Sequence, residues 1–392
     1  MKETSYWIAL AHLPRWGAAK INSLTIKFLH DEKISIDHFF HLDVEAWKSK
    51  YGLVTQDVSD LLKARSDLPN LAFLAEQLFN EGFEIIPLNS FDYSPTLKTN
   101  LKATYSPVIL YTKGNKQLMK EKSIAIVGSR EASEISLEFA DNIAKTASTE
   151  YKVVVSGFAK GIDKQALDSA IKYKGQSIIV LPQGILTFAS GFKKYYKQIV
   201  EGDVLILSTF FPKAPWKTEL AMARNPIIYG LAEEIYVAES SEKGGTWSGV
   251  INGLKRKRKI FVRKPTPNEK NANNLLIKKG AIAVDYYGKE VLTAYSEIDL
   301  FENPPSIVSE PTQLEKEESN EKESLESKIC FLLSQTPLTA KELIAKLKIK
   351  WTTRKLTNLL KKNPRIEINK LKKSNLFKLR ETSLQKQKTL FD

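Results

Sequence analysis

The middle of the chain alternates between short, strongly apolar runs and longer segments with helical spacing. Runs that lack alternating polar positions are typical of strands buried on both faces of a sheet. Because helical segments separate the runs, their order predicts βαβ units and a parallel, doubly wound sheet of the α/β class. The expected strands cover residues 123–127, 152–155, 177–181, 204–207, 234–238, 259–262 and 281–284.

The first hundred residues show a different pattern. Helical spacing covers residues 6–29, with interruptions at Pro14 and Gly17, and it returns at 72–81. We therefore expect a small helical domain over residues 1–85. For residues 82–121 we expect a short strand-and-turn connection into the sheet domain.

Charge is concentrated at the C-terminal end. The formal net charge is +14, yet residues 331–392 alone carry +12 and residues 302–326 carry −6. The acidic segment is rich in proline and poor in apolar residues, so burial cannot offset the entropy lost on ordering, and it is interpreted as a linker. The sheet domain then covers residues 86–301 and a basic domain covers 327–392.

Composition limits the class of protein. A chain of 392 residues, 42% hydrophobic and 27% charged, has room for two or three globular domains. No apolar run approaches the roughly 18 residues that cross a bilayer, and the first residues do not resemble a secretory signal, so we expect a cytoplasmic protein. Cys330 is the single cysteine and every histidine precedes residue 42. We therefore expect no metal, no cofactor, and no Ser–His or Cys nucleophile in the sheet domain.

Small residues and cations gather where three expected strands end, at residues 128–130, 156–163 and 239–246. In a doubly wound sheet, ligands bind at the carboxyl ends of the strands, and helix N-termini there attract anions. The loops therefore predict an anion-binding cradle, with glycines that only make tight turns as the alternative. Neither GxxxxGK[ST] nor a GxGxxG after the first strand occurs, which argues against P-loop hydrolysis and dinucleotide redox chemistry.

Several stretches resemble the DNA processing protein A family (DprA, also called Smf), and they lie in one order over nearly the whole chain. They are YWIALAHLP (6–14), residues 91–115, SIAIVGSR (123–130), VVVSGFAKGID (153–163), IIVLPQGI (178–185), ARNPIIYGLAEEIYVAES (223–240) and NNLLIKKGA (273–281). The resemblance implies a helical domain of the SAM or helix-hairpin-helix kind, followed by an extended Rossmann-like domain. It also implies a homodimer that binds single-stranded DNA, protects incoming or processed DNA and loads a RecA-type recombinase, without being an enzyme. The residues favour none of natural transformation, repair and defence over the others.

The resemblance also assigns DNA-binding residues. Cations and backbone amides can hold phosphates without reading bases, as sequence-tolerant binding requires. The basic run 255–259 adds two further candidates, although such a run also fits a solvated helix end. The candidates in the sheet domain are Gly128, Ser129, Arg130, Ser156, Gly157, Lys160, Arg224, Asn225, Lys255 and Arg256.

The chain departs from the family pattern at some of these loops. Pro226 replaces an expected arginine, and Leu167 replaces an expected histidine. Gly245 and Thr246 also fit the PGGxGTxxE loop of the LOG nucleotide phosphoribohydrolases, but Gly249 stands where that loop has its glutamate. A glycosidic hydrolase without this carboxylate lacks a group that acts at its reacting centre. A LOG-like hydrolase and a nucleotide-binding sensor are the alternative functions.

The basic C-terminal domain has the pattern of three short helices followed by two strands, which predicts a winged helix. Thr339 and Glu342 form a capping box for the second helix, and residues 365–369 and 376–380 are the expected strands. The excess of cations predicts contact with DNA, with docking of a protein as the alternative. The candidate DNA contacts on and after the third helix are Arg354, Lys355, Lys361 and Lys362.

Overall fold

The computed structural model describes residues 3–291 and, in the C-terminal part, residues 329, 332–333, 336–347, 352–360, 366–370 and 375–379. Two compact units, Met1–Glu302 and Asn303–Asp392, make up the chain. No helix within the described ranges combines the length and the hydrophobicity that a membrane crossing requires.

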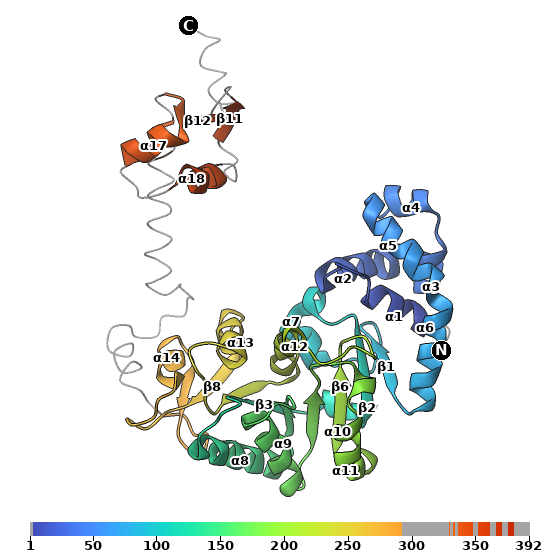
Figure 1. The fold of residues 1–392 in the computed structure, drawn as a ribbon, viewed down its shortest axis with the longest axis vertical. Helices are drawn as coiled ribbons and strands as arrows, with labels where there is room; N and C mark the ends of the chain where they lie inside the picture. The colour runs from blue at the N-terminus through green and yellow to red at the C-terminus, as the bar shows by residue number, and fades with distance from the viewer. Residues whose placement is uncertain are drawn as a thin grey trace. The chain divides into compact units, whose positions relative to one another are not determined.

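A nine-stranded sheet forms the centre of the first unit (Figure 1). Its strand order is β1-β2-β6-β5-β4-β3-β7-β8-β9, and the strands from β6 to β9 in this order run parallel, as the apolar runs predict. The strands are β1 (Glu84–Pro87), β2 (Ile109–Gly114), β3 (Ser123–Val127), β4 (Val153–Ser156), β5 (Ser177–Val180), β6 (Val204–Ser208), β7 (Glu234–Val237), β8 (Lys259–Arg263) and β9 (Ile282–Val284).

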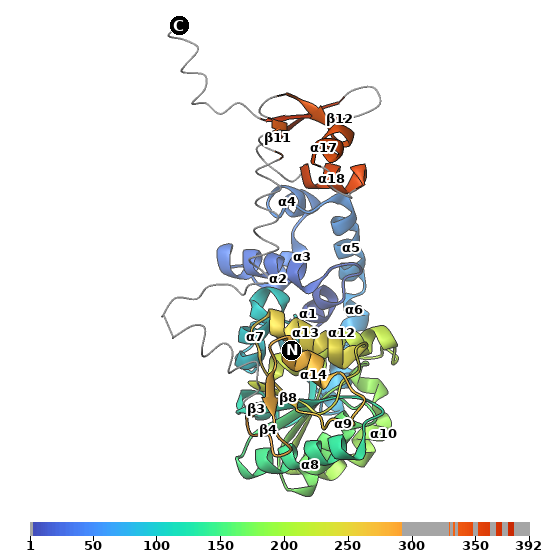
Figure 2. The ribbon, with the colours of Figure 1, turned by 90° about the vertical axis from the view of Figure 1, so that its left-hand side faces the viewer.

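Helices cover both faces of this sheet, with α8 and α9 on one side and α12 and α13 on the other (Figures 1 and 2). Ile124 and Ile126 of β3 pack toward the first face, and Ala125 and Val127 pack toward the second. Burial on both faces explains why the strands read as continuous apolar runs. The helices of the sheet region are α7 (Pro95–Tyr105), α8 (Glu134–Thr149), α9 (Ile162–Lys172), α10 (Ala189–Lys194), α11 (Tyr196–Glu201), α12 (Thr218–Leu231), α13 (Gly245–Lys255) and α14 (Asn273–Lys278), with 3-10 turns η2 (Lys116–Lys120) and η3 (Ile185–Thr187).

Residues 82–121 contain more structure than the expected strand-and-turn connection. β1 and β2 pair antiparallel, and β2 pairs antiparallel with β6, so the sheet is mixed rather than parallel throughout. The helix α7 lies between them in the sequence and is capped by Ser94, whose side chain accepts a hydrogen bond from the Leu97 amide. Leu97 and Leu101 are the buried side chains of α7, and two apolar positions are too few to show a helical period. The expectation of a simple strand-and-turn connection, without this helix, was therefore wrong.

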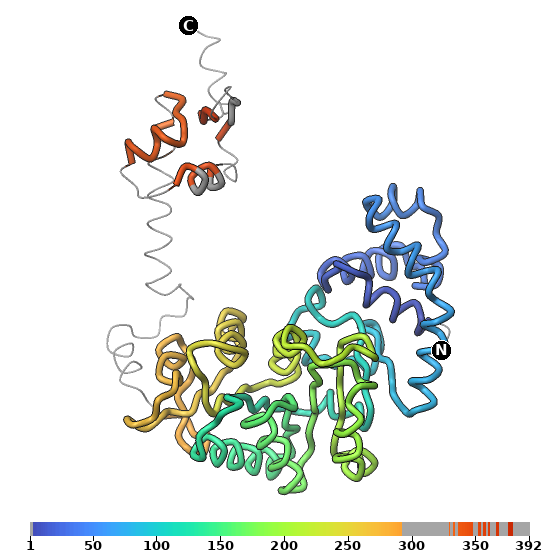
Figure 3. The backbone as a smooth tube through the Cα atoms, in the orientation of Figure 1, coloured from blue at the N-terminus to red at the C-terminus, as the bar shows by residue number. Residues whose placement is uncertain are grey.

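A run of helices builds residues 4–80, and its core is aromatic. Phe28, Phe39 and Trp47 are fully buried, and the Trp47 indole donates a hydrogen bond of 3.0 Å to the Phe39 carbonyl. The same apolar cluster continues into Tyr111 and Ile206 of the sheet, so the helices and the sheet share one core. Figure 3 shows the backbone running from these helices into the sheet region. The helices are α1 (Thr4–Ala11), α2 (Ala18–Ile26), the π-helical η1 (Lys27–Asp31), α3 (Ile36–His41), α4 (Val44–Ser49), α5 (Thr55–Ser66) and α6 (Leu68–Asn80).

The second unit holds a small apolar core around Leu343, Leu356 and Phe377. The expected capping box is present, because the Thr339 amide donates to the Glu342 carboxylate at 2.7 Å and the Glu342 amide donates to the Thr339 hydroxyl at 3.4 Å. In the described part of this unit, three strands pair antiparallel in the order β10-β12-β11. The elements are β10 (Leu338–Thr339), α17 (Ala340–Leu347), α18 (Thr353–Leu360), β11 (Ile366–Lys370) and β12 (Asn375–Leu379).

Candidate nucleic-acid interface

The candidate site lies where the strand order of the sheet reverses. The chain passes from β3 through β4 and β5 to β6 on one side, and then crosses along α12 to place β7 on the other side of β3. Loops that leave neighbouring strands in opposite directions open a crevice at the carboxyl ends of those strands. A cavity of about 360 Å³ lies at this point between the β3 and β7 loops, and we call it the switch-point cavity. Its lining includes Gly128, Ser129, Arg130, Asp163, Met222, Arg224, Asn225, Tyr229, Lys243, Gly244, Gly245 and Thr246.

Five of the residues that the resemblance assigns to DNA binding line this cavity together: Gly128, Ser129, Arg130, Arg224 and Asn225. They come from two segments almost a hundred positions apart in the sequence. Arg130 is exposed, so its guanidinium is accessible to a ligand from solvent.

Ser156, Gly157 and Lys160, the candidates expected after β4, are not among these five. Ser156 is fully buried and its hydroxyl donates a hydrogen bond of 2.7 Å to the Ile126 carbonyl, so the side chain joins β4 to β3. Gly157 is also buried. Lys160 is exposed and lies outside the lining of the cavity.

Glycines allow the loops to pack closely around the cavity. Gly161 has φ 86°, and a side chain there would place Cβ 2.4 Å from the Ser129 carbonyl oxygen. The Ile162 amide donates to that same oxygen at 3.2 Å. Across the cavity, the Thr246 hydroxyl donates to the Gly128 carbonyl at 3.0 Å. The β3 loop is therefore held from both sides, with the N-terminal turn of α13 at the cavity wall.

A buried ion pair forms the floor of this arrangement. Arg224 is 3% exposed, and its Nη1 lies 3.4 Å from Oδ2 of Asp163, which is also buried. Burial raises the pKa of the Asp163 carboxyl, and the charge of Arg224 opposes this shift. Burial also lowers the pKa of Arg224, which Asp163 opposes. Because Asp163 offsets much of the Arg224 charge, Arg130 and the exposed Lys243 are the cations most available to an anion.

The basic run 255–259 does not join the switch-point cavity. It starts at the C-terminal end of α13, about 15 Å along the helix from the Gly245 turn that lines the cavity. Lys255 and Arg256 are exposed. Arg258 donates to the backbone carbonyls of Ala232 and Glu233, and Lys259 pairs with Glu234 at 2.7 Å, so these last two cations serve the fold.

The C-terminal candidates belong to the second unit. Arg354 and Lys355 lie in α18, and Lys361 and Lys362 lie outside the described residues.

Lys243, Asp163 and Thr246 lie in loops that the sequence assigns to the anion-binding cradle, but none of the three was named among the DNA-binding candidates. Lys243 and Thr246 belong to the glycine-rich loop after β7, and the pairing of two glycines with a threonine at a helix start was the signal that could have identified them. Asp163 follows Gly161 in the second loop, but only the fold places it against Arg224.

Position 249, where the LOG loop has its glutamate, has no space for a side chain in this protein. A Cβ atom on Gly249 would lie 2.9 Å from the Tyr229 hydroxyl and 3.0 Å from its ring, so a longer side chain there would displace a buried tyrosine. Among the described residues that line the switch-point cavity, Asp163 is the acidic one. Its carboxylate is paired with Arg224. In the described part of the chain, no group of three or more His, Cys, Asp or Glu side chains is arranged to hold a metal ion.

Comparison with known proteins agrees with this architecture. The DNA processing protein DprA of Streptococcus pneumoniae is 33% identical over 157 residues, which cover 40% of this chain and 55% of that protein. The match thus spans about half the length of that relative. DprA of Bacillus subtilis is 29% identical over 248 residues, covering 60% of this chain and 76% of that protein.

A solved structure shows the same fold. The X-ray structure of DprA from Streptococcus pneumoniae superposes with a TM-score of 0.58 at 24% identity, covering 71% of this chain and 93% of that one. The family described as DNA recombination-mediator protein A matches residues 84–295, which is more than half of the chain and includes the whole sheet with its switch-point cavity. The chain therefore belongs to the DNA recombination-mediator protein A family.

Proposed function

We propose that this protein binds single-stranded DNA as a recombination mediator, with the switch-point cavity holding backbone phosphates. The observation that carries the proposal is the meeting of exposed Arg130, exposed Lys243 and the N-terminal turn of α13 at one cavity. Helix N-termini and cations bind phosphates without reading base edges. Family membership supports the same function.

The proposal extends to partners. By likeness to its family we propose that the protein acts as a homodimer in the cytoplasm, protects incoming or processed strands and delivers them to a RecA-type recombinase. Light scattering tests the dimer, and strand-exchange kinetics with a purified recombinase test the loading.

A titration of a fluorescent single strand tests the cavity. Arg130→Ala should weaken binding by about 10- to 150-fold, because a hydrogen bond to a charged group contributes about 1.5–3 kcal/mol. Lys160→Ala tests the neighbouring loop in the same way. Lys145→Ala is the matched control, since this exposed lysine lies near the end of α8, away from the strand ends. Unchanged affinity in Arg130→Ala would refute the assigned cavity, and unchanged affinity in Lys160→Ala would refute a contact by the neighbouring loop.

We further propose that the second unit is a winged helix that contacts DNA. Support comes from the order of α17, α18 and the paired strands β11 and β12, together with the charge of +12 over residues 331–392. We also assign residues 1–85 to a SAM or helix-hairpin-helix type domain by likeness to the family.

The enzyme alternative is less well supported. A phosphoribohydrolase needs a carboxylate at its reacting centre, and position 249 has no room for one. Incubation with nucleoside monophosphates tests this class, and we expect no released base. Release of free base at a rate that scales with protein concentration would overturn the proposal.

A further inference from the structure

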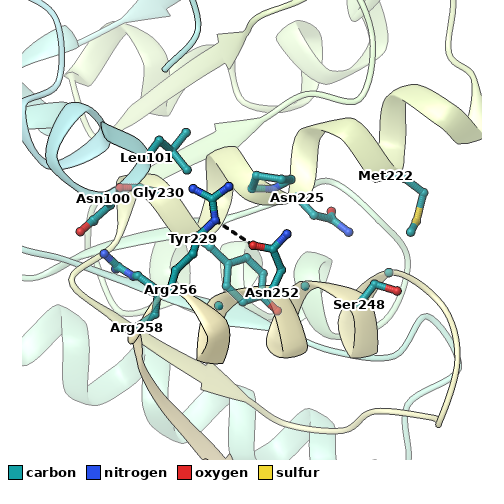
Figure 4. A pocket seen from close by; sticks show the side chains of 14 residues that line it. Asn100, Leu101, Met222, Asn225, Tyr229, Gly230, Ser248, Asn252, Arg256 and Arg258 are labelled. Atoms are coloured by element: carbon teal, nitrogen blue, oxygen red, sulfur yellow. Dashed lines mark hydrogen bonds between the residues drawn. The ribbon is translucent and has the colours of Figure 1, made fainter. Parts of the chain in front are cut away.

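A second, smaller cavity lies between α12 and α13, with α7 at one end. Its volume is about 120 Å³, and we call it the interhelix cavity. Figure 4 shows Met222 and Asn225 from α12 and Asn252 from α13 directed into the space between the two helices. Met222, Asn225, Tyr229 and Gly245 line both this cavity and the switch-point cavity, so the two are neighbours with a common wall.

Two sequence features shape the interhelix cavity. Gly245, Gly249 and Gly253 are spaced four apart on α13, and a Cβ at 249 or 253 would meet Tyr229 or Ile260 at 3 Å or less. Pro226, the substitution for the family's arginine, lines the interhelix cavity and not the switch-point cavity. The chain thus has an apolar proline surface where its family pattern has a long cation.

Tyr229 is one of the polar groups among the described residues that the fold leaves without a partner. The residue is 6% exposed, and its buried hydroxyl makes no hydrogen bond within the described structure. Burial raises the pKa of Tyr229 above its ordinary value, so the phenol stays neutral and can both donate and accept. A buried hydroxyl without a partner is costly, and such groups in native proteins call for a ligand or water.

The size of the interhelix cavity indicates what it can hold. Sites for whole small molecules are roughly 300–1,000 Å³, so a cavity of about 120 Å³ fits a single ring system and not a complete nucleotide or cofactor. The larger switch-point cavity beside it offers cations for a phosphate. A ligand with a flat ring on one side and a phosphate on the other fits both spaces together.

The lining suits a ring with apolar faces and a polar edge. Leu101, Met222 and Pro226 supply apolar surface, and the amides of Asn225 and Asn252 supply donors and acceptors. Among the described residues, no acidic side chain lines the cavity, which disfavours a cationic ligand. The Arg256 guanidinium is held by Asn252 at 2.8 Å and lies 5.5 Å from the Tyr105 ring.

We propose that the interhelix cavity binds one nucleobase, whose own phosphate lies in the switch-point cavity. The base can come from the bound strand, turned out of its stack, or from a free nucleotide. For a base that comes from the strand, the inference rests on the proposed function, because only a protein that binds single strands would meet such a base. In this proposal Arg256, which the sequence predicts to contact phosphates, lies at the rim of the base site.

The test compares a thymidine oligomer with an abasic oligomer of the same length, so that phosphates are constant and bases are not. Wild type should prefer the thymidine oligomer at least fivefold, because each bound base adds its own affinity. Tyr229→Phe removes only the hydroxyl and should lower this preference about two- to tenfold. Ser248→Leu, at an exposed position of the lining, adds bulk at the mouth and should lower it as well.

Tyr51→Phe is the matched control, since Tyr51 is another buried tyrosine whose hydroxyl lacks a partner, and it lies in the N-terminal helices. Thermal unfolding confirms that each variant is folded. A second arm titrates thymidine 5′-monophosphate without DNA: binding that Tyr229→Phe weakens assigns the free nucleotide, and a loss confined to the oligomer assigns the strand.

Two negative results are distinct. If both oligomers bind but Tyr229→Phe and Ser248→Leu keep the wild-type preference, and no nucleotide binds, the interhelix cavity is not a base site. If neither oligomer binds wild type, the proposed function fails, and the nucleotide titration alone then decides the base site.

Discussion

Gly157→Ala tests the packing beneath the switch-point cavity with a single added methyl group. Gly157 follows β4 and does not have a positive φ, so alanine can adopt its backbone without strain. Its Cβ, however, would lie 1.9 Å from Nη1 of Arg224 and 2.3 Å from Oδ2 of Asp163. Both distances are far below van der Waals contact, so at least one of the two side chains must move.

The cost follows from where those atoms lie. They are the ends of side chains, which would swing away cheaply at a surface, but Arg224 and Asp163 are buried and paired at 3.4 Å. Overpacking a core costs about 1–3 kcal/mol, and separating a buried ion pair adds to this because it leaves charge uncompensated. We expect the free energy of unfolding to fall by about 2–4 kcal/mol. Strand affinity should fall too, because Arg224 lines the cavity.

Denaturant unfolding followed by tryptophan fluorescence measures the first effect. Gly17→Ala is the control, because no atom lies within 4 Å of its added Cβ and its φ is −80°; its free energy of unfolding should stay within about 0.5 kcal/mol of wild type. A Gly157→Ala protein with wild-type stability and wild-type strand affinity would refute the reasoning that the ion pair is locked in place.

Two further predictions concern pH and salt. Burial lowers the pKa of His12 to about 4, and its ring nitrogen lies 2.9 Å from the Tyr111 hydroxyl; the unfolded chain therefore takes up the proton first. Stability from this group should be complete above about pH 6.5 and be lost as pH falls toward 4, by about 3 kcal/mol. His12→Gln should lack this component, and identical pH profiles of the free energy of unfolding for the two proteins would contradict it. Deleting residues 303–392 should flatten the salt dependence of strand binding from a log–log slope of about −3.5, the value for about five neutralised phosphates on a single strand; an unaltered slope would show that the second unit does not touch DNA.

The sequence was a good guide to the elements of the sheet. Each of the seven apolar runs became a parallel strand, because burial on both faces leaves a continuous apolar signal in the chain. The capping box at Thr339 and Glu342 was likewise predictable from the sequence, since it depends on two residues three positions apart. α7 was missed because its two buried leucines are too few to show a period.

The outcome for individual site residues depended on contacts that sequence patterns do not carry. Ser156 was expected in a loop like that of Gly128, yet it is the last residue of β4, and its hydroxyl faces inward and joins β4 to β3. Arg224 looks like a free cation in the sequence but is buried against Asp163. Lys255 and Arg256 look close to the glycine-rich loop but lie at the opposite end of α13.

By itself, then, the sequence determined local structure: which runs are strands, where loops rich in glycine and cations follow them, and where charge accumulates. Only the tertiary structure decided which loops meet. The crossover along α12 places β7 beside β3 and so brings residues 128–130 together with 243–246. Parallel strands buried on both faces resemble one another in sequence, so their order is set by long-range packing. That same packing turned Pro226 toward a second cavity, which no local pattern could have indicated.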